Sequence, residues 1–129
     1  MGSEPRTWVL VAELRKPPMT ANDQRRATWR TMRAAKHEAG QLVWALAKQA
    51  RVPLLRRARV DVVWHAPTRT RRDADALGPF LKATLDGLVQ AGVLGDDDYR
   101  HVPRVGLGVE IDRARPRIEI TITELGEPS

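Results

Sequence analysis

The chain has 129 residues, of which 42% are hydrophobic and 29% charged, a balance that fits one compact domain over residues 1–129 and excludes a disordered chain. No apolar run approaches the roughly 20 residues that cross a bilayer, the N-terminus lacks the pattern of a secretory signal, and the absence of cysteine excludes disulfides and thiolate chemistry. The 22 Lys and Arg against 16 Asp and Glu give a net charge of +6, which favours anionic partners such as nucleic acid.

The first part of the chain predicts one strand and one long helix. Residues 8–14 read WVLVAEL, which is rich in β-favouring side chains, and a pair of prolines stops this strand. Thr20 and Asn22 suit the N-cap of an amphipathic helix that reaches about Ala50, and Gly40 is a place where it could break. The outer face of this helix would carry basic residues, namely Arg25, Arg26, Arg30, Arg33 and Lys36.

The second part predicts three more strands and a second helix. Residues 58–66 and 117–123 alternate between apolar and polar side chains as half-buried strands do, and residues 105–111 form a strand between them in sequence. Gly78 and Pro79 suit a helix start, and Gly92 suits its C-terminal cap. We expect residues 113–117 to form a hairpin turn between the last two strands. The fold class is therefore α+β, in the order β-α-β-α-β-β, with a small mixed sheet covered by two helices.

The stretch from residue 71 to 98 carries the residues suited to chemistry. Asp73 and Asp75 are two apart, so in an extended segment both carboxylates would project to one side, just before a helix. Neighbouring carboxylates repel unless a cation lies between them, and Mg²⁺ binds such oxygens while keeping waters. Lys82, one turn into the helix, could stabilise charge on a phosphate or a leaving oxygen. A second acidic group, 96–98, follows that helix.

Each of these features also has a purely structural interpretation. Aspartates before a helix are common caps, and an acidic turn is usually only solvated. Lys82 and Asp86 are four apart and suit a surface ion pair. The combination favours a site that cleaves phosphodiesters, because Arg71 and Arg72 directly precede the acidic pair, and a structural cap has no need of them.

The stretch resembles the RusA family of Holliday-junction resolvases in the segments RRDAD (71–75), KATLDGL (82–88) and AGVLGDD (91–97). The resemblance implies a homodimeric crossover junction endodeoxyribonuclease that acts in DNA recombination and repair. It would bind four-way DNA and make paired nicks with Mg²⁺, for which Mn²⁺ can substitute. The metal-binding carboxylates would be Asp73, Asp75 and Asp97, with Lys82 as the catalytic lysine. The run of three aspartates leaves Asp96 as an alternative to Asp97.

Two departures from the family pattern accompany this resemblance. Ala76 stands where the family has Asn, and the interval from Asp75 to Lys82 is longer, with residues 78–80 as the apparent extra. Our candidates for DNA contacts are five arginines: Arg25, Arg26, Arg69, Arg71 and Arg72. The expected location is the cytoplasm of a bacterial or phage-infected cell.

Two other functions stay open from the sequence. The chain could be a non-catalytic protein that binds branched DNA on the same scaffold, or a basic α+β domain that binds another protein. The histidines lack metal-ligand spacing and are expected in structural or surface positions: His37, His65 and His101. We expect the tryptophans to anchor the core, with base stacking as the alternative: Trp8, Trp29, Trp44 and Trp64.

Overall fold

The computed structural model describes residues 5–20 and 28–127. The elements are β1 (Thr7–Ala12), α2 (Trp29–Gln49), β2 (Ala58–Ala66), the 3₁₀ turn η1 (Ala74–Leu77), α3 (Gly78–Gln90), β3 (Arg104–Ile111) and β4 (Arg117–Glu124). The predicted α+β class and the order β-α-β-α-β-β are confirmed. Within the described segments, no helix has the length and apolar character required to cross a membrane.

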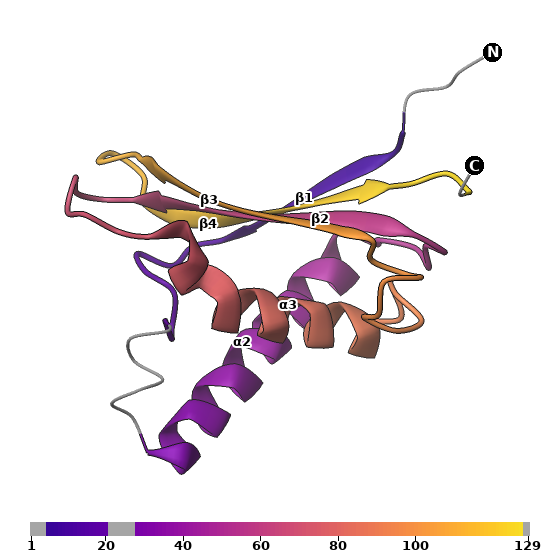
Figure 1. Ribbon diagram of the computed structural model, residues 1–129, viewed down its shortest axis with the longest axis horizontal. Helices are drawn as coiled ribbons and strands as arrows, with labels where there is room; N and C mark the ends of the chain where they lie inside the picture. Colours follow the sequence, from indigo (N-terminus) through magenta and orange to yellow (C-terminus); the bar gives the residue numbers. More distant parts are fainter. Residues whose placement is uncertain (1–4, 21–27, 128–129) are drawn as a thin grey trace.

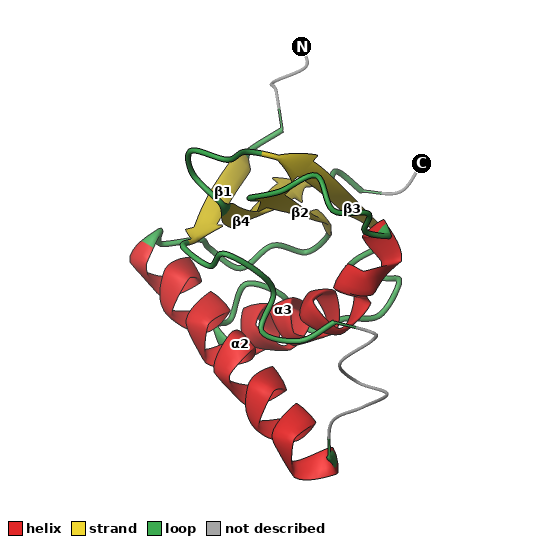
Figure 2. Cartoon of the chain, turned by 90° about the vertical axis from the view of Figure 1, so that its left-hand side faces the viewer, coloured by secondary structure: helices red, strands yellow, loops and turns green. Residues whose placement is uncertain are grey.

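The sheet has four strands in the order β1-β4-β2-β3. β4 is antiparallel to both of its neighbours, and β2 is parallel to β3. Both helices lie on the same side of this sheet, which leaves its other face without a covering layer of described elements (Figures 1 and 2).

The predicted hairpin between the last two strands is wrong, because β2 lies between β3 and β4. The helix α3 returns the chain along the sheet, so β3 enters parallel to β2 at the edge. The connection that follows β3 then crosses the end of β2, where Asp112 N donates to Ala66 O at 2.9 Å. β4 therefore pairs on the far side of β2.

The core lies between the sheet and the helices, and the alternation of the strands builds it as expected. Ile118, Ile120 and Ile122 are fully buried, and they face the same layer as Val60 and Val62 of β2. Each apolar side chain removed from water in this way contributes about 1.5–3 kcal/mol. The helices fill the other side with Met32, Ala39, Val43, Ala47, Phe80, Ala83 and Leu88.

The start of α3 and its cap agree with the sequence. The helix begins at Gly78, and Pro79 occupies its first turn, where a missing N–H costs nothing. Gly92 lies just past the C-cap with φ of 78°, a conformation that glycine adopts without strain.

The long helix departs from the prediction at two points. In the described residues it begins at Trp29, and the Thr28 hydroxyl caps it by accepting from Thr31 N at 3.2 Å. Asn22, Arg25 and Arg26 lie outside the described residues. The helix also runs unbroken through Gly40, and here it passes close to α3: a Cβ added at Gly87 of α3 would lie only 2.6 Å from Gly40 O, whereas one added at Gly40 would lie 3.6 Å from Ala83 O.

The tryptophans follow the prediction only in part. Trp64 is buried at 8% exposure and donates from Nε1 to Arg15 O, and Trp8 packs against the core from its edge. Trp29 and Trp44 are 71% and 39% exposed, so they are not core anchors. The N-terminal turns of α2, where Trp29 begins the helix, extend well clear of the sheet (Figures 1 and 2).

Candidate functional site

The candidate site begins in the loop that follows β2. β2 and β3 end on the same side of the molecule, and there the chain bends back into η1 and α3 (Figure 1). Arg72 holds this bend: it donates to Thr68 O at 2.6 Å and to Thr70 O at 2.9 Å, and its guanidinium lies 4.6 Å from the centre of the Trp64 ring. Arg72 therefore orders the loop, whereas Arg69 and Arg71 are exposed to solvent.

Asp73 and Asp75 do not share one extended segment, so the condition under which both carboxylates would project to one side is not met. Asp73 is extended, with φ of −99° and ψ of 135°, but Asp75 lies within η1. The turn forms because Ala76 N donates to Asp73 O at 3.0 Å, as in a 3₁₀ helix. Both side chains are exposed.

The position of Asp73 also bears on the alternative that these aspartates are caps. Asp73 occupies the N-cap position of η1, yet its side chain makes no capping hydrogen bond to the described turn. An aspartate used as a cap would accept from one of the first free backbone N–H groups. The carboxylate at this position is therefore available to a ligand.

Lys82 and Asp97 are brought together, although fifteen residues separate them in sequence. Lys82 Nζ donates to Asp97 Oδ2 at 2.6 Å. The contact exists because the loop after α3 turns at Gly92 and folds back along the helix. Lys82 also lies 3.4 Å from Asp86 Oδ1, so the expected surface ion pair is present beside the shorter contact.

This pair keeps both of its members ionised. The hydrogen bond from Lys82 lowers the pKa of Asp97, and the same bond raises the pKa of Lys82 against the opposing effect of burial. Asp97 is 28% exposed and Lys82 57% exposed, so solvent screens part of the attraction. The arrangement holds a positive ammonium at a fixed place beside α3.

The three consecutive aspartates have three different surroundings, which the sequence could not distinguish. Asp97 contacts Lys82, while Asp96 turns its Oδ1 to accept from Asp97 N at 2.7 Å. Asp98 accepts from His101 Nδ1 at 2.7 Å and from Arg100 Nη2 at 2.6 Å. The acidic run is therefore more than a solvated turn, and Asp97 is the member that lies next to Lys82.

The network of Asp98 is the part that sequence reasoning missed. The bonds from His101 and then Arg100 lower the pKa of Asp98 to about 2. The spacing of Asp98 and His101, three residues apart in a turn, is the signal that could have indicated this contact. Asp98 thus organises the loop that positions its neighbour Asp97.

A cavity of about 230 Å³ opens beside the Lys82–Asp97 pair. It is lined by three residues of α3 and two residues of the loop that follows, namely Asp86, Val89, Gln90, Asp96 and Asp97. Asp73 and Asp75 do not line it. Asp96 and Asp97, which follow α3, therefore form a group separate from Asp73 and Asp75, which precede it.

The expected metal centre can be compared with this geometry. Across residues 5–20 and 28–127, no three His, Cys, Asp or Glu side chains come close enough to hold one metal ion together. Asp73, Asp75 and Asp97 therefore do not form a single three-carboxylate cluster. The exposed oxygens of Asp73 and Asp75 are the hard ligands that Mg²⁺ prefers, whereas Asp97 is engaged by Lys82.

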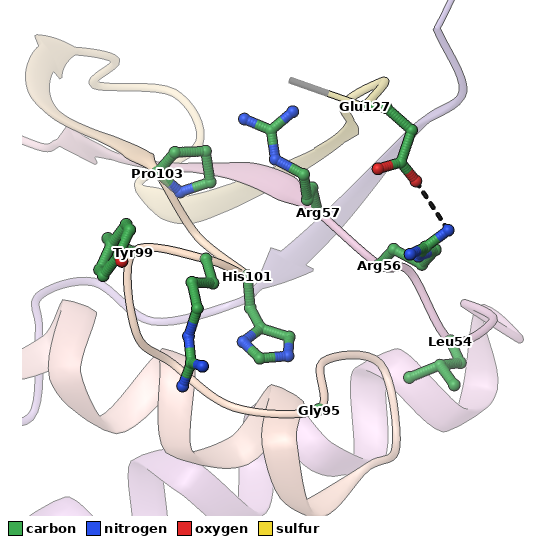
Figure 3. A pocket seen from close by; sticks show the side chains of 9 residues that line it. Leu54, Arg56, Arg57, Gly95, Tyr99, His101, Pro103 and Glu127 are labelled. Atoms are coloured by element: carbon green, nitrogen blue, oxygen red, sulfur yellow. Dashed lines mark ion pairs between the residues drawn. The ribbon is translucent and has the colours of Figure 1, made fainter. Parts of the chain in front are cut away.

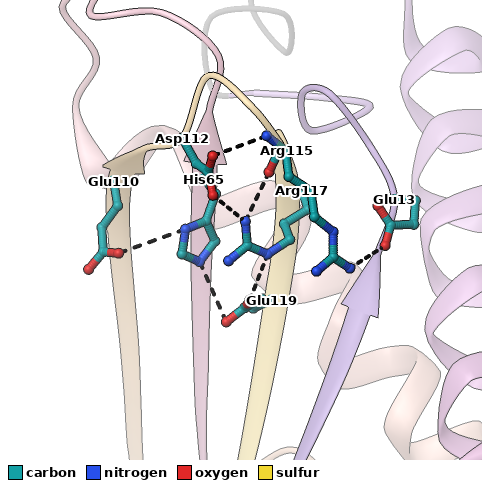
Figure 4. Close-up of polar contacts among 7 residues, drawn as sticks. All are labelled: Glu13, His65, Glu110, Asp112, Arg115, Arg117 and Glu119. Carbon is teal, nitrogen blue, oxygen red and sulfur yellow. Dashed lines mark hydrogen bonds and ion pairs between the residues drawn. The ribbon is translucent and has the colours of Figure 1, made fainter.

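The remaining polar cluster lies on the uncovered face of the sheet (Figure 4). His65, only 9% exposed, stands between Glu119 and Glu110, with ring nitrogens 3.5 and 3.7 Å from their carboxylates. Arg117 donates to Glu119 at 2.7 Å and to Asp112 at 2.8 Å, and its bond lowers the pKa of Glu119. These contacts tie β2, β3 and β4 together, which agrees with a structural role for His65.

Comparison of the sequence with models of known protein families and with curated proteins finds no match.

Proposed function

We propose that this protein is a metal-dependent endonuclease that cleaves phosphodiester bonds in branched DNA, with the four-way junction as its substrate. The observation that supports the proposal best is the contact between Lys82 and Asp97, at 2.6 Å. It lies on the helix that the chain enters directly from Asp73 and Asp75. Residues far apart in the sequence, which the RusA resemblance singles out, thus share one helix and its flanking loops.

In this proposal the acidic residues bind the metal ion, and the lysine stabilises negative charge on the substrate. Asp73 and Asp75 would hold a magnesium or manganese ion, which supplies electrophilic assistance at the phosphate. Lys82 is kept protonated by Asp97, so it can offset negative charge on a phosphate oxygen or on the leaving oxygen. Asp97 is assigned here to holding Lys82, because it accepts a hydrogen bond from Lys82 Nζ at 2.6 Å.

The basic residues near the site suit the DNA backbone. Arg69 and Arg71 are exposed in the loop directly before Asp73, and arginine can donate two parallel hydrogen bonds to a phosphate. Arg72, which also orders this loop, belongs to the proposed set, and Arg25 and Arg26, outside the described residues, complete it. Contacts of this kind carry affinity and make binding sensitive to salt.

The proposal includes a homodimer, which would work in recombination and repair in the cytoplasm. A four-way junction has two-fold symmetry and is resolved by two symmetric cuts, so a two-fold dimer would match its substrate. A chain that stays monomeric by light scattering at the concentration of the cleavage assay would contradict this part alone.

The decisive experiment is cleavage of a labelled synthetic four-way junction in Mg²⁺, in Mn²⁺ and in EDTA, beside a linear duplex of the same sequence. We expect cleavage of the junction with either ion and none in EDTA. Asp75→Asn should abolish cleavage and retain binding, while Glu38→Gln, which removes an exposed carboxylate from α2, should change neither. Unchanged cleavage by Asp75→Asn would overturn the assignment of the site.

One observation supports a second candidate, a protein that binds branched DNA without cutting it: Ala76 stands where the family pattern has an amide side chain. This candidate predicts salt-sensitive binding to the junction and no cleavage in any divalent ion. The assay above therefore separates the two functions.

A further inference from the structure

A separate hollow of about 650 Å³ lies where three distant parts of the chain meet (Figure 3). It is bordered by the segment before β2, the loop between α3 and β3, and the segment after β4. The lining residues that matter below are Leu54, Arg56, Arg57, Tyr99, Arg100 and His101.

Backbone hydrogen bonds fix the walls of this hollow relative to one another. Leu55 N donates to Val93 O at 2.8 Å, and Ala58 N donates to His101 O at 2.8 Å. Leu125 N donates to Arg57 O at 3.0 Å. The hollow therefore exists before any ligand arrives, which lowers the entropic cost of binding one.

The charge around the hollow favours an anion. Arg56, Arg57 and Arg100 line it together with the single carboxylate of Glu127, and Arg100 is already paired with Asp98 at 2.6 Å. Arg57 donates to the neutral carbonyl of Gly126, so Arg56 and Arg57 supply the positive charge that a ligand would meet. Arg56 pairs with Glu127 at 2.8 Å, but the two side chains are 84% and 64% exposed. Since exposed pairs of this kind are weak, a phosphate can replace Glu127 as the partner of Arg56.

The rest of the lining favours a ligand with a flat apolar part. Tyr99 is 78% exposed and Leu54 68% exposed, and Pro103 adds a third apolar surface. Apolar surface that borders a concave, partly charged hollow is typical of ligand-binding sites. An aromatic ring offers a stacking platform for any base.

His101 adds a polar group of defined orientation. Its Nδ1 lies 2.7 Å from Asp98 Oδ1, and a carboxylate only accepts, so Nδ1 carries the proton. In the neutral ring Nε2 is then an acceptor. This nitrogen faces Gly95, where an added Cβ would lie 3.2 Å from it.

We propose that this hollow binds a nucleotide, with its phosphate at Arg56 and Arg57 and its base against Tyr99, which lies across the hollow from Leu54 (Figure 3). The loop between α3 and β3 thus presents Asp97 to Lys82 and lines a different site through Gly95, before Asp97, and Tyr99, after it. The binding needs no metal ion and stands apart from the proposed cleavage. The nucleotide could be a free monophosphate or a residue at the unpaired end of a DNA strand.

Tyr99 provides a direct probe, because it is the only tyrosine in the chain. Protein labelled with 3-fluorotyrosine gives one ¹⁹F resonance, which reports on the hollow alone. In EDTA, we expect thymidine 5′-monophosphate to shift this resonance saturably, and thymidine or inorganic phosphate to bind about tenfold more weakly, as expected when one part of a composite ligand is removed. Octathymidylate distinguishes the sources: tighter binding than the monophosphate indicates a strand, and weaker binding indicates a free nucleotide.

Variants complete the test by calorimetry on unlabelled protein. Arg56→Ala should weaken binding of the monophosphate about tenfold, the loss of one charge-assisted hydrogen bond. Arg113→Ala removes the same charge from an exposed position outside the hollow and should leave the affinity unchanged. Asp75→Asn should also bind normally, which keeps this result separate from any failure of cleavage.

Three results would overturn the proposal. The ¹⁹F resonance could stay unmoved at millimolar monophosphate, inorganic phosphate could bind as tightly as the nucleotide, or Arg56→Ala could bind as well as the unmodified protein. An unmoved resonance would exclude binding of the nucleotide in the hollow. Equal binding of inorganic phosphate would exclude recognition of the base, and unchanged binding by Arg56→Ala would exclude Arg56 as a phosphate ligand.

Discussion

Lys82 Nζ and Asp97 Oδ2 lie 2.6 Å apart, and this contact joins the second turn of α3 to the loop that follows the same helix. A lysine in water samples many rotamers, so a carboxylate that holds it fixes both its charge and its place. Asp86, 3.4 Å away on the next turn, adds a second and weaker attraction. The loop between α3 and β3 therefore determines where this ammonium stands relative to Asp73 and Asp75.

The first prediction concerns that ammonium. Replacing it in Lys82→Met keeps the length of the side chain and removes its charge, and we expect junction cleavage to slow by about 100-fold or more, the usual effect of deleting one electrostatic group that stabilises a transition state. The measurement is the single-turnover rate at saturating protein. Binding of the junction should change little, because the DNA backbone is assigned to the arginines.

Asp86→Asn is the matched control for that variant. It removes the other carboxylate near Lys82, on the exposed side of α3, and leaves the contact with Asp97 in place. We expect its rate to stay within about twofold of the unmodified protein, since exposed pairs contribute little. Equal losses in both variants would show that net charge near α3, and not the placement of Lys82, governs the rate.

The second prediction is the titration of Asp98. Its pKa is lowered to about 2 by hydrogen bonds from His101 and Arg100. A folded-state pKa below the ordinary value of 3.8 means that this carboxylate stabilises the fold above pH 4, and that the contribution is lost as the pH falls toward 2. Carbon-detected NMR of the carboxyl groups should show this value, and His101→Ala should return it toward 3.8. An unchanged titration in His101→Ala would contradict the assigned cause.

Local patterns predicted most of the elements, because they depend on neighbours in sequence. Alternation identified the buried face of β4, with Ile118, Ile120 and Ile122, and proline and glycine marked the ends of α3. The strand order was beyond such reasoning. It depends on how α3 packs across the sheet, and that packing places β2 between the last two strands.

The candidate site likewise has features that the sequence predicts and others that depend on the tertiary fold. The residue types of Asp73, Asp75 and Lys82 are visible in the sequence, but spacing alone cannot tell whether a loop returns to its helix. It therefore could not choose between Asp96 and Asp97, and the extended segment it assumed for Asp75 is a 3₁₀ turn. Hydrophobicity likewise placed Trp29 in the core, although its face of α2 meets solvent.

The third prediction tests the close crossing of the two helices. Gly87→Ala would place a Cβ 2.6 Å from Gly40 O and 3.1 Å from the Val43 Cβ, so the helices must separate. We expect a loss of about 1–3 kcal/mol in the free energy of unfolding, measured by urea denaturation. Gly78→Ala is the control, since an added Cβ there meets nothing within 4 Å, and it should be stabilising by up to about 1 kcal/mol. Similar changes in both variants would mean that helix propensity, and not the crossing, sets the outcome.

The last prediction concerns a buried hydroxyl on α3. Thr84 is completely buried, and within the described residues its Oγ1 has no hydrogen-bond partner. A buried donor without a partner carries its full desolvation cost, and valine has nearly the same shape with similar helix propensity. We therefore expect Thr84→Val to raise the free energy of unfolding by about 1 kcal/mol. Thr84→Ser keeps the hydroxyl and deletes a buried methyl group, so it should lower that energy by about 1 kcal/mol. A destabilised Thr84→Val would show that the hydroxyl has a partner, such as a buried water, that offsets its burial.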